Sequence, residues 1–133
     1  LALGPGMTIH LDTSVLIRMG LTATPSAQWL AQWLAEGREV AVSSIAWGEY
    51  LCGPLNKEQR ANSRQVVGDP LPFAEPDAEL AAELFNLAGR RRRSLPDCQI
   101  AAVAIRFGAA LATVNPADFA RFTPAGLVLA VRP

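Results

Sequence analysis

The stretch "LPDCQIAAVAIRFGAALATV", Leu95 to Val114, contains the change of pattern that decides the fold. Its first part repeats apolar residues at the i, i+3, i+4 and i+7 spacing of one helix face. Gly108 ends this repeat, and the run "AALATV" that follows it is short, apolar and typical of a buried strand. The sequence therefore predicts a helix over 95–108 that leads directly into a strand over 109–114.

The same alternation of strands and helices extends in both directions along the chain. Strands alternating with helices are typical of an α/β protein with a mostly parallel sheet and helices on both faces. We expect a short helix at Val15 to Ile17, capped by Thr13 or Ser14. Further strands are expected over 7–11, 39–44 and 126–131, and further helices over 25–37, 45–53, 57–67 and 76–90.

Composition is that of one globular domain. The chain has 133 residues, of which 50% are hydrophobic and 18% are charged, and this balance excludes a disordered protein. No apolar stretch is long enough to predict a membrane span, and we expect a cytoplasmic protein. Residues 1–6 have no pattern and are interpreted as an expression remnant or disordered tail, which leaves a single domain over 7–133.

Charge and metal-ligand counts narrow the function classes. Twelve basic and twelve acidic residues balance, so any binding of nucleic acid must depend on local clusters of charge. The single histidine, His10, argues against zinc sites and histidine-based catalysis and is expected to be structural. Cys52 and Cys98 lack metal-binding spacing, and two reduced cysteines are favoured over a disulfide.

Four acidic residues fall where strands end or helices begin. Asp12 follows the first predicted strand, and Glu49 lies in the helix after the second. Asp97 opens the helix over 95–108, and Asp118 follows the third strand. Ligands of parallel sheets bind at the carboxyl ends of the strands, so these carboxylates are candidates for one shared site.

A cluster of carboxylates is unfavourable unless a cation neutralises it. Ligand sets made only of oxygen select Mg²⁺ or Mn²⁺, and such ions activate water for hydrolysis of phosphodiesters. Taken singly, Asp97 is also explained as a helix N-cap, Asp118 as a turn residue and Glu49 as a solvated position. Asp12 is the least well explained in this way, because Thr13 or Ser14 is available as the cap.

Three blocks of the sequence together resemble the PIN domain, in particular the VapC group of toxin ribonucleases of type II toxin–antitoxin pairs. The blocks are "LDTSVLI", "SSIAWGEYLCG" and "LPDCQIAAVAIRFGAALATVNPADFARF", in that order and at suitable spacing. The resemblance covers nearly all of the chain from Met7 onward.

The resemblance implies a three-layer α/β/α sandwich and a Mg²⁺ or Mn²⁺ site formed by Asp12, Glu49, Asp97 and the region from Asn115 to Asp118. Because Asn115 is neutral, the fourth acidic role is assigned to Asp118, with Asn115 binding water or phosphate. Thr13, Ser14 and Thr113 are expected to orient the metal ligands.

The activity implied by the resemblance is cleavage of single-stranded RNA, often tRNA or rRNA. A cognate antitoxin would inhibit the enzyme, which is expected to be a homodimer or part of a larger toxin–antitoxin complex. In this hypothesis Asp12, Asp97 and Asp118 hold one or two ions, and Glu49 positions the nucleophilic water or a second ion.

The run "GRRRRS" over 89–94 places four arginines directly before Asp97. These residues, Arg90, Arg91, Arg92 and Arg93, are candidates for contact with the RNA backbone or with an antitoxin. A solvated loop that balances nearby glutamates is the alternative. Trp29, Trp33 and Trp47 are candidates for a dimer or antitoxin groove, although for Trp29 and Trp33 a place in the core is favoured over an interface.

Other function classes fit the motifs less well. A haloacid-dehalogenase-type phosphotransferase requires an Asp at the position of Ser14, and a dinucleotide-binding fold requires a glycine-rich turn after the first strand. A receiver requires a lysine near its last strands, whereas Lys57 is the only lysine. A receiver-like or catalytically degraded PIN-like interaction domain is the alternative that stays open, and metal binding discriminates it from the nuclease.

Overall fold

The computed structural model of the chain describes residues 3–19 and 24–130. In this part of the chain, four strands pair in the order β2-β1-β3-β4, and each pairing is parallel. Parallel neighbours require crossover connections, which the helices between the strands provide. The strands are β1 (Ile9–Leu11), β2 (Val40–Ala41), β3 (Ala110–Ala112) and β4 (Val128–Leu129).

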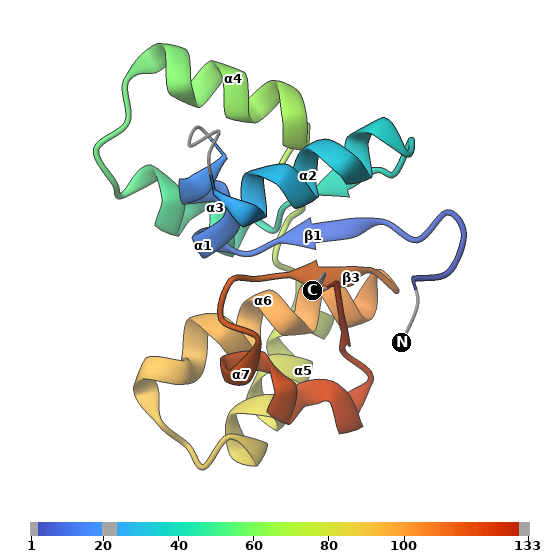
Figure 1. The fold of residues 1–133 in the computed structure, drawn as a ribbon. Coiled ribbons are helices and arrows are strands. Elements are labelled where there is room, and N and C mark those ends of the chain that lie inside the picture. The colour runs from blue at the N-terminus through green and yellow to red at the C-terminus, as the bar shows by residue number, and fades with distance from the viewer. Residues whose placement is uncertain (1–2, 20–23, 131–133) are drawn as a thin grey trace.

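Helices surround this sheet in two groups (Figure 1). One group, α1 to α4, gathers beside β1, and the other, α5 to α7, lies beside β3. The α-helices are α1 (Thr13–Arg18), α2 (Pro25–Ala35), α3 (Ser44–Leu51), α4 (Lys57–Val67), α5 (Glu75–Leu87), α6 (Leu95–Arg106) and α7 (Pro116–Phe119), and two 3₁₀ segments are η1 (Arg92–Ser94) and η2 (Ala120–Ala125).

The predicted α/β sandwich with a parallel central sheet is confirmed. The helix predicted over 57–67 is found with the same bounds, because Asn56 and Gln59 form a capping box at its start. β1 begins two residues later than predicted and ends as predicted, whereas β2 and β3 are shorter than predicted at both ends. α7 and the 3₁₀ segments were not predicted. Val131, within the strand expected over 126–131, lies outside the described residues.

The core is apolar side chains packed on both faces of the short strands. Ile9 and Leu11 of β1 and Leu111 of β3 are completely buried. Trp33 and Trp47 are also buried, with 1% and 6% of their surface exposed, and Trp29 packs half-buried against the core. The predicted core position of Trp33 is therefore confirmed. The core thus holds β1 and β3 side by side, with their carboxyl ends at the same edge of the sheet.

His10 lies in β1 as a buried structural residue, as predicted. Its ring packs against the ring of Phe107, with centroids 5.9 Å apart. Burial lowers the pKa of His10 to about 4, so the imidazole is neutral at physiological pH. Cys52 and Cys98 are both free, which agrees with the prediction of reduced cysteines.

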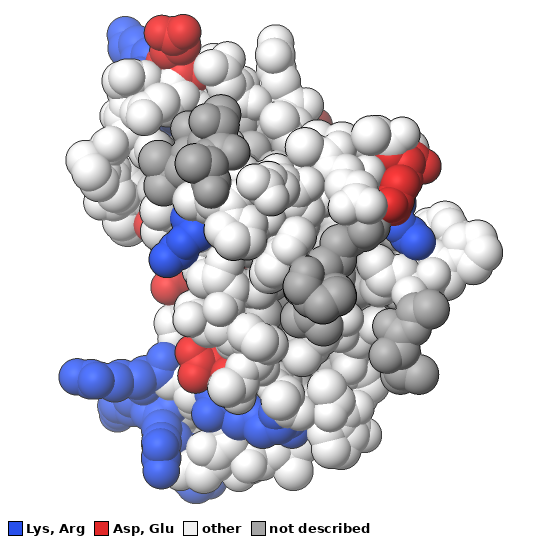
Figure 2. Space-filling view, in the orientation of Figure 1, with Lys and Arg blue, Asp and Glu red and all other residues white. Residues whose placement is uncertain are grey.

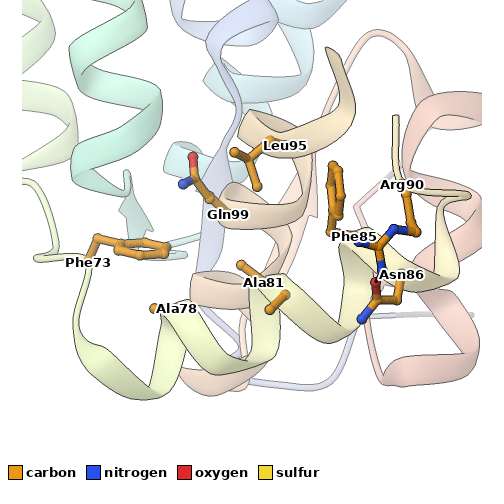
Figure 3. A pocket seen from close by; sticks show the side chains of 9 residues that line it. Phe73, Ala78, Ala81, Phe85, Asn86, Arg90, Leu95 and Gln99 are labelled. Carbon is orange, nitrogen blue, oxygen red and sulfur yellow. Dashed lines mark hydrogen bonds between the residues drawn. The ribbon is translucent and has the colours of Figure 1, made fainter. Parts of the chain in front are cut away.

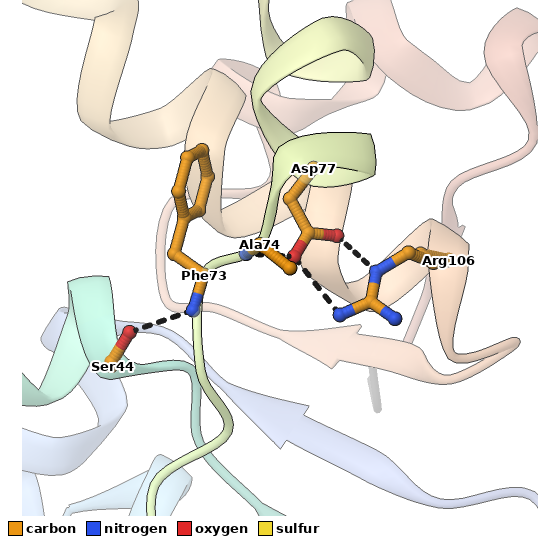
Figure 4. A network of polar contacts seen from close by, with 5 residues as sticks. All are labelled: Ser44, Phe73, Ala74, Asp77 and Arg106. Atoms are coloured by element: carbon orange, nitrogen blue, oxygen red, sulfur yellow. Dashed lines mark hydrogen bonds and ion pairs between the residues drawn. The ribbon is translucent and has the colours of Figure 1, made fainter.

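An ion pair connects α5 to α6 (Figure 4). The carboxylate of Asp77 is completely buried and accepts hydrogen bonds from Nε and Nη2 of Arg106. It also accepts a hydrogen bond of 2.8 Å from the backbone N–H of Ala74, at the start of α5. One side chain therefore caps α5 and ties it to the last turn of α6.

The described N-terminal residues are held to the rest of the domain by Arg38. Arg38 donates hydrogen bonds to the carbonyl oxygens of Gly4 and Met7, at 3.0 and 3.3 Å. The division of the chain at residue 7 stays a prediction, and residues 1–2 lie outside the described residues. Across the described residues, we find no helix with the length and apolar character needed to span a membrane.

Replacing Ser63 by alanine should lower the free energy of unfolding by about 1 to 2 kcal/mol, because it leaves a buried hydroxyl without its partner. The hydroxyls of Tyr50 in α3 and Ser63 in α4 are 2.5 Å apart and buried. Tyr50→Phe added to Ser63→Ala should cost less than the sum of the two single changes. Urea denaturation of the four proteins measures this coupling, and additive losses would show that the bond contributes nothing.

Candidate functional site

Asp12 lies at the end of β1 and caps α1. Its Oδ1 accepts hydrogen bonds from the backbone N–H of Val15, at 3.1 Å, and from the hydroxyl of Ser14, at 2.5 Å. The prediction that Thr13 or Ser14 provides this cap is therefore wrong. The chain turns into the helix one or two residues earlier than expected, so that Thr13 is already helical. The cap holds the Asp12 carboxylate in one place.

Hydroxyl groups join the carboxyl ends of β1 and β3. The backbone N–H of Asp12 donates to the carbonyl of Ala112, at 3.1 Å. The hydroxyl of Ser14 accepts a hydrogen bond of 3.2 Å from the N–H of Val114. The buried hydroxyl of Thr113 hydrogen-bonds to the Asp12 carboxylate and accepts a bond of 3.0 Å from the N–H of Asn115. These contacts fix Asp12 relative to the loop after β3.

Glu49 reaches the same edge of the sheet from α3. Ser43 caps α3 by accepting a hydrogen bond of 3.1 Å from the N–H of Ala46. Glu49 is exposed, and its Oε1 accepts a hydrogen bond of 2.8 Å from the hydroxyl of Thr13. Thr13 and Ser14 therefore each donate a hydrogen bond to one of the acidic side chains. Their role in orienting metal ligands stays a prediction.

Asp97 and Asp118 come from the helices on the other side of β3. Asp97 lies in the first turn of α6, but the N-cap of that helix is Ser94, so Asp97 is not the cap. Asp118 lies in α7, which begins directly after Asn115. The backbone N–H of Asp118 donates to the carbonyl of Asn115, at 3.0 Å, and closes the turn that carries both residues.

These side chains line one pocket with a volume of about 190 Å³. The structure thus brings together all four predicted acidic residues, along with Asn115, from segments far apart in the sequence. Thr113 lies behind this lining and acts through Asp12. The pocket is lined by Asp12, Thr13, Ser14, Glu49, Asp97, Ile100, Asn115, Asp118 and Phe119.

Ile100 and Phe119 were not singled out as pocket residues from the sequence. Both are buried, and both follow an acidic residue of the pocket at close spacing, three positions after Asp97 and one after Asp118. Helical spacing was the available signal for Ile100, since residues three apart share a helix face. These two buried side chains form the apolar part of the pocket lining.

The carboxylates of the pocket repel one another. Burial, followed by the negative charges of Asp118 and Asp12, raises the pKa of Asp97 to about 6, although Arg121 opposes this shift. Burial also raises the pKa of Asp12, against the hydrogen bonds from Ser14 and Thr113. The pocket therefore holds more negative charge than its own hydrogen-bond donors compensate.

The donor atoms of the pocket fit a hard divalent cation, because they are carboxylate and amide oxygens with no sulfur or imidazole. Excess negative charge favours such an ion as well. However, in the described ranges no group of three or more His, Cys, Asp or Glu side chains is arranged to hold a metal ion as it stands. Asp12 and Glu49 instead accept hydrogen bonds from Ser14 and Thr13 of the same pocket.

The arginine run does not line this pocket. Arg90 has a left-handed backbone conformation, with φ of 60°, and donates a hydrogen bond of 2.9 Å to Oδ1 of Asn86. Both residues line a separate pocket of about 390 Å³ between α5 and α6, together with apolar side chains such as Phe85 and Leu95 (Figure 3). Arg91, Arg92 and Arg93 are exposed on the loop that leads to Asp97.

Solved structures of toxin–antitoxin proteins share this fold. The VapBC2 complex from Rickettsia felis, bound to a promoter DNA fragment, contains a chain that is 23% identical over 96% of this chain and 100% of its own, with a TM-score of 0.73. A toxin–antitoxin complex from Klebsiella pneumoniae is 26% identical over 85% of this chain and 91% of its own, with a TM-score of 0.68.

A third structure is VapC20 from Mycobacterium tuberculosis, described as a toxin that cleaves the sarcin–ricin loop. It is 21% identical over 95% of this chain and 100% of its own, with a TM-score of 0.65. The identities of the Rickettsia and Mycobacterium proteins are low, so these two likenesses concern the fold. The sequence also matches the family model of the PIN domain over residues 9–123, which include every acidic residue of the pocket. This chain belongs to the PIN domain family.

Proposed function

We propose that the protein is a metal-dependent endoribonuclease that acts as the toxin of a toxin–antitoxin pair and cleaves single-stranded regions of RNA. The observation that carries this proposal is the pocket in which Asp12, Glu49, Asp97 and Asp118 meet at the carboxyl end of a parallel sheet. Membership of the PIN domain family and the likeness to toxins of solved complexes support the same assignment. The tRNA and rRNA of the cell are the proposed substrates.

In this proposal, Asp12, Asp97 and Asp118 hold Mg²⁺ or Mn²⁺. When bound, the ion would offset negative charge on the scissile phosphate and increase the acidity of the attacking water. Thr13 keeps Glu49 at the rim of the pocket, where its carboxylate can orient that water. Ser14 and Thr113 hold the Asp12 carboxylate, and Asn115 offers an amide to the phosphate.

The proposed partner is a cognate antitoxin protein that blocks the pocket. The Klebsiella relative was solved as a toxin–antitoxin complex, and this is the basis of the proposal. We further propose that the toxin is a homodimer within that complex. Co-expression with the neighbouring open reading frame, followed by size-exclusion chromatography with light scattering, measures both assemblies.

Purified protein should cleave RNA in the presence of Mg²⁺ or Mn²⁺ and should lose this activity in EDTA. The reason is that the acidic pocket repels a phosphate unless a cation neutralises it. Cleavage is measured on total RNA and on single-stranded oligonucleotides. Adding back Mg²⁺ in excess of EDTA is the control and should restore the activity. Cleavage that persists at full rate in EDTA would contradict the proposed metal site.

A catalytically degraded interaction domain is the second candidate. It is favoured by the side-chain arrangement, since no three acidic groups of the described chain are placed to hold an ion as they stand, and by the neutral Asn115. Calorimetric titration with Mg²⁺ and Mn²⁺ discriminates the two functions. Binding supports the nuclease, whereas the absence of both binding and cleavage identifies the interaction domain.

A further inference from the structure

Basic side chains gather on one side of the acidic pocket. Figure 2 shows them over the loop between α5 and α6 and over the segment that follows α7, with acidic side chains close by. The residues concerned are Arg91, Arg92 and Arg93 before Asp97, and Arg121 in η2. We call these four residues the arginine rim. All are exposed, and within residues 3–19 and 24–130 no ion pair is formed by any of them.

Arg121 is placed at the pocket by the turns that carry Asp118. The two residues are three positions apart across α7 and η2, and three-residue spacing in continuous helical turns puts side chains on the same side. The guanidinium lies over the ring of Phe122, with Cζ 4.9 Å from the centroid. Phe122 is completely buried and packs against Phe119 of the pocket wall, so the platform under Arg121 is fixed.

The charge of Arg121 acts on Asp97, one of the four carboxylates of the pocket. It lowers the pKa of Asp97 and that of the neighbouring thiol of Cys98, against the larger effect of burial on both groups. Among the described residues, however, Arg121 has no ion pair with Asp97 or Asp118. Its exposed guanidinium therefore has no carboxylate partner in this part of the chain and is available to a ligand.

Other arginines are not placed in this way. Arg90 is bound to Asn86 in the separate pocket between α5 and α6 (Figure 3). Arg106 is bound to Asp77, Arg64 to Asp69, and Arg18 donates to the carbonyl of Ser14. Each of these side chains already has an acceptor within the protein. The distinction separates the rim from the basic residues that serve the fold.

We propose that the arginine rim binds the phosphates of single-stranded RNA, with Arg121 holding a phosphate at the pocket and Arg91, Arg92 and Arg93 holding the strand beyond it. This inference rests on the proposed nuclease function. Four carboxylates repel a polyanion, so the enzyme needs compensating cations that are close to the pocket and free of partners. Guanidinium groups bind phosphate through two parallel hydrogen bonds, which positions the strand as well as attracting it.

The first test measures binding separately from cleavage. Affinity for a fluorescent single-stranded oligoribonucleotide is measured at several salt concentrations, in EDTA and in an Asp12→Asn background. Each lost phosphate contact should reduce the slope of log affinity against log salt by about 0.7. Arg121→Ala should therefore lower the slope by about 0.7, and Arg91→Ala with Arg92→Ala and Arg93→Ala by about 2.

Arg60→Ala is the matched control for both measurements. Arg60 is an exposed arginine of α4, which lies at the other end of the molecule from α5 and α6 (Figure 1). Its replacement removes the same charge from the protein and should leave the slope unchanged. An equal reduction of the slope by Arg60→Ala would show that the affinity for RNA depends only on the net charge of the protein. That result would contradict the proposed role of the arginine rim.

The second test measures catalysis with the intact pocket. Arg121→Ala should lower kcat/KM on oligoribonucleotides about 10- to 100-fold, because a charge-assisted contact with the phosphate is lost. Arg121→Lys should recover part of this loss, whereas the triple replacement of Arg91, Arg92 and Arg93 should act mainly on KM. If all these variants keep the kinetics and the binding slopes of the parent protein, and the parent protein cleaves RNA, the proposed RNA-binding role of the arginine rim is contradicted. The proposed nuclease function is not affected by that result.

Two further outcomes distinguish a failure of the arginine rim from a failure of the proposed nuclease function. If the parent protein cleaves no RNA but its binding slope falls in the rim variants, the nuclease fails and the phosphate-binding rim is supported. If the rim variants lose affinity for a polyglutamate peptide and keep their affinity for RNA, the rim is a surface for an acidic protein segment, and the inference is overturned.

Discussion

Asp12→Asn should reduce RNA cleavage on the order of 10²- to 10³-fold or more while leaving the fold intact, because it removes a charge aimed at the reaction and keeps the contacts that build the site. The side chain is 4% exposed and lies where β1 ends. Asparagine retains an oxygen that can accept from Val15 and Ser14, so the cap of α1 survives. Turnover of a single-stranded oligoribonucleotide in Mg²⁺ measures the loss.

The same substitution should raise the melting temperature in EDTA. Asp12 is one of the charges that raise the pKa of Asp97, so removing it relieves repulsion in the folded state. Carboxylates kept together at a cost in stability are expected where function requires them. Mg²⁺ should raise the melting temperature of the parent protein and have much less effect on the variant, since ligand binding stabilises the folded state.

Glu58→Gln is the matched control for Asp12→Asn. Glu58 is an exposed acidic residue in the first turn of α4, away from the pocket lining. Its replacement should change neither turnover nor the effect of Mg²⁺ on melting. Full activity of Asp12→Asn would show that the Asp12 charge is not needed for cleavage. A variant that fails to fold would show that this charge is needed for stability.

The order of strands and helices could be predicted from the sequence because each element carries a local signal. The helix over 95–108 and the strand over 109–114 differ in the period of their apolar residues, and Gly108 separates them. The observed elements are α6 and β3, shortened by one to two residues at the ends. Strand ends depend on pairing with neighbours, which no local pattern contains.

The acidic residues of the pocket could also be predicted, because parallel strands bring their carboxyl ends to one edge. The residue that caps α1, by contrast, could not be predicted. Either Thr13 or Ser14 is a good N-cap by type, yet Asp12 takes the cap, since the preceding strand ends at Leu11. The short turns of α7 and η2 carry no periodic signal, so Arg121, whose charge acts on Asp97, could not be singled out from the sequence.

Asp77 was outside every sequence-based expectation, and its replacement should have the largest effect on stability among the polar residues of the fold. Asp77→Ala should lower the free energy of unfolding by about 2 to 3 kcal/mol, because it removes charge-assisted hydrogen bonds and a helix cap. Its partner Arg106 is 29 residues away in sequence, a separation that hides the pair from any local pattern. Urea denaturation at neutral pH measures the loss.

The pH dependence of this loss identifies its cause. Burial alone would raise the pKa of Asp77, but the hydrogen bonds from Arg106 and Ala74 and the charge of Arg106 bring it below its ordinary value. A carboxyl with a lowered pKa binds fewer protons in the folded state than in the unfolded state, so its contribution is complete above the unfolded pKa. As the pH falls through the folded pKa, that contribution disappears.

The difference in stability between the parent protein and Asp77→Ala should therefore be constant near neutral pH and shrink below about pH 4, near the unfolded pKa of an aspartate. Asp77→Asn is the control, because it keeps the size and one acceptor while removing the charge. Asp77→Asn should lose less of the free energy of unfolding than Asp77→Ala. Its difference in stability from the parent protein should also shrink below about pH 4. A difference that stays constant through the acid range would show that Asp77 contributes by packing, and the ion pair between α5 and α6 would then be incidental to the fold.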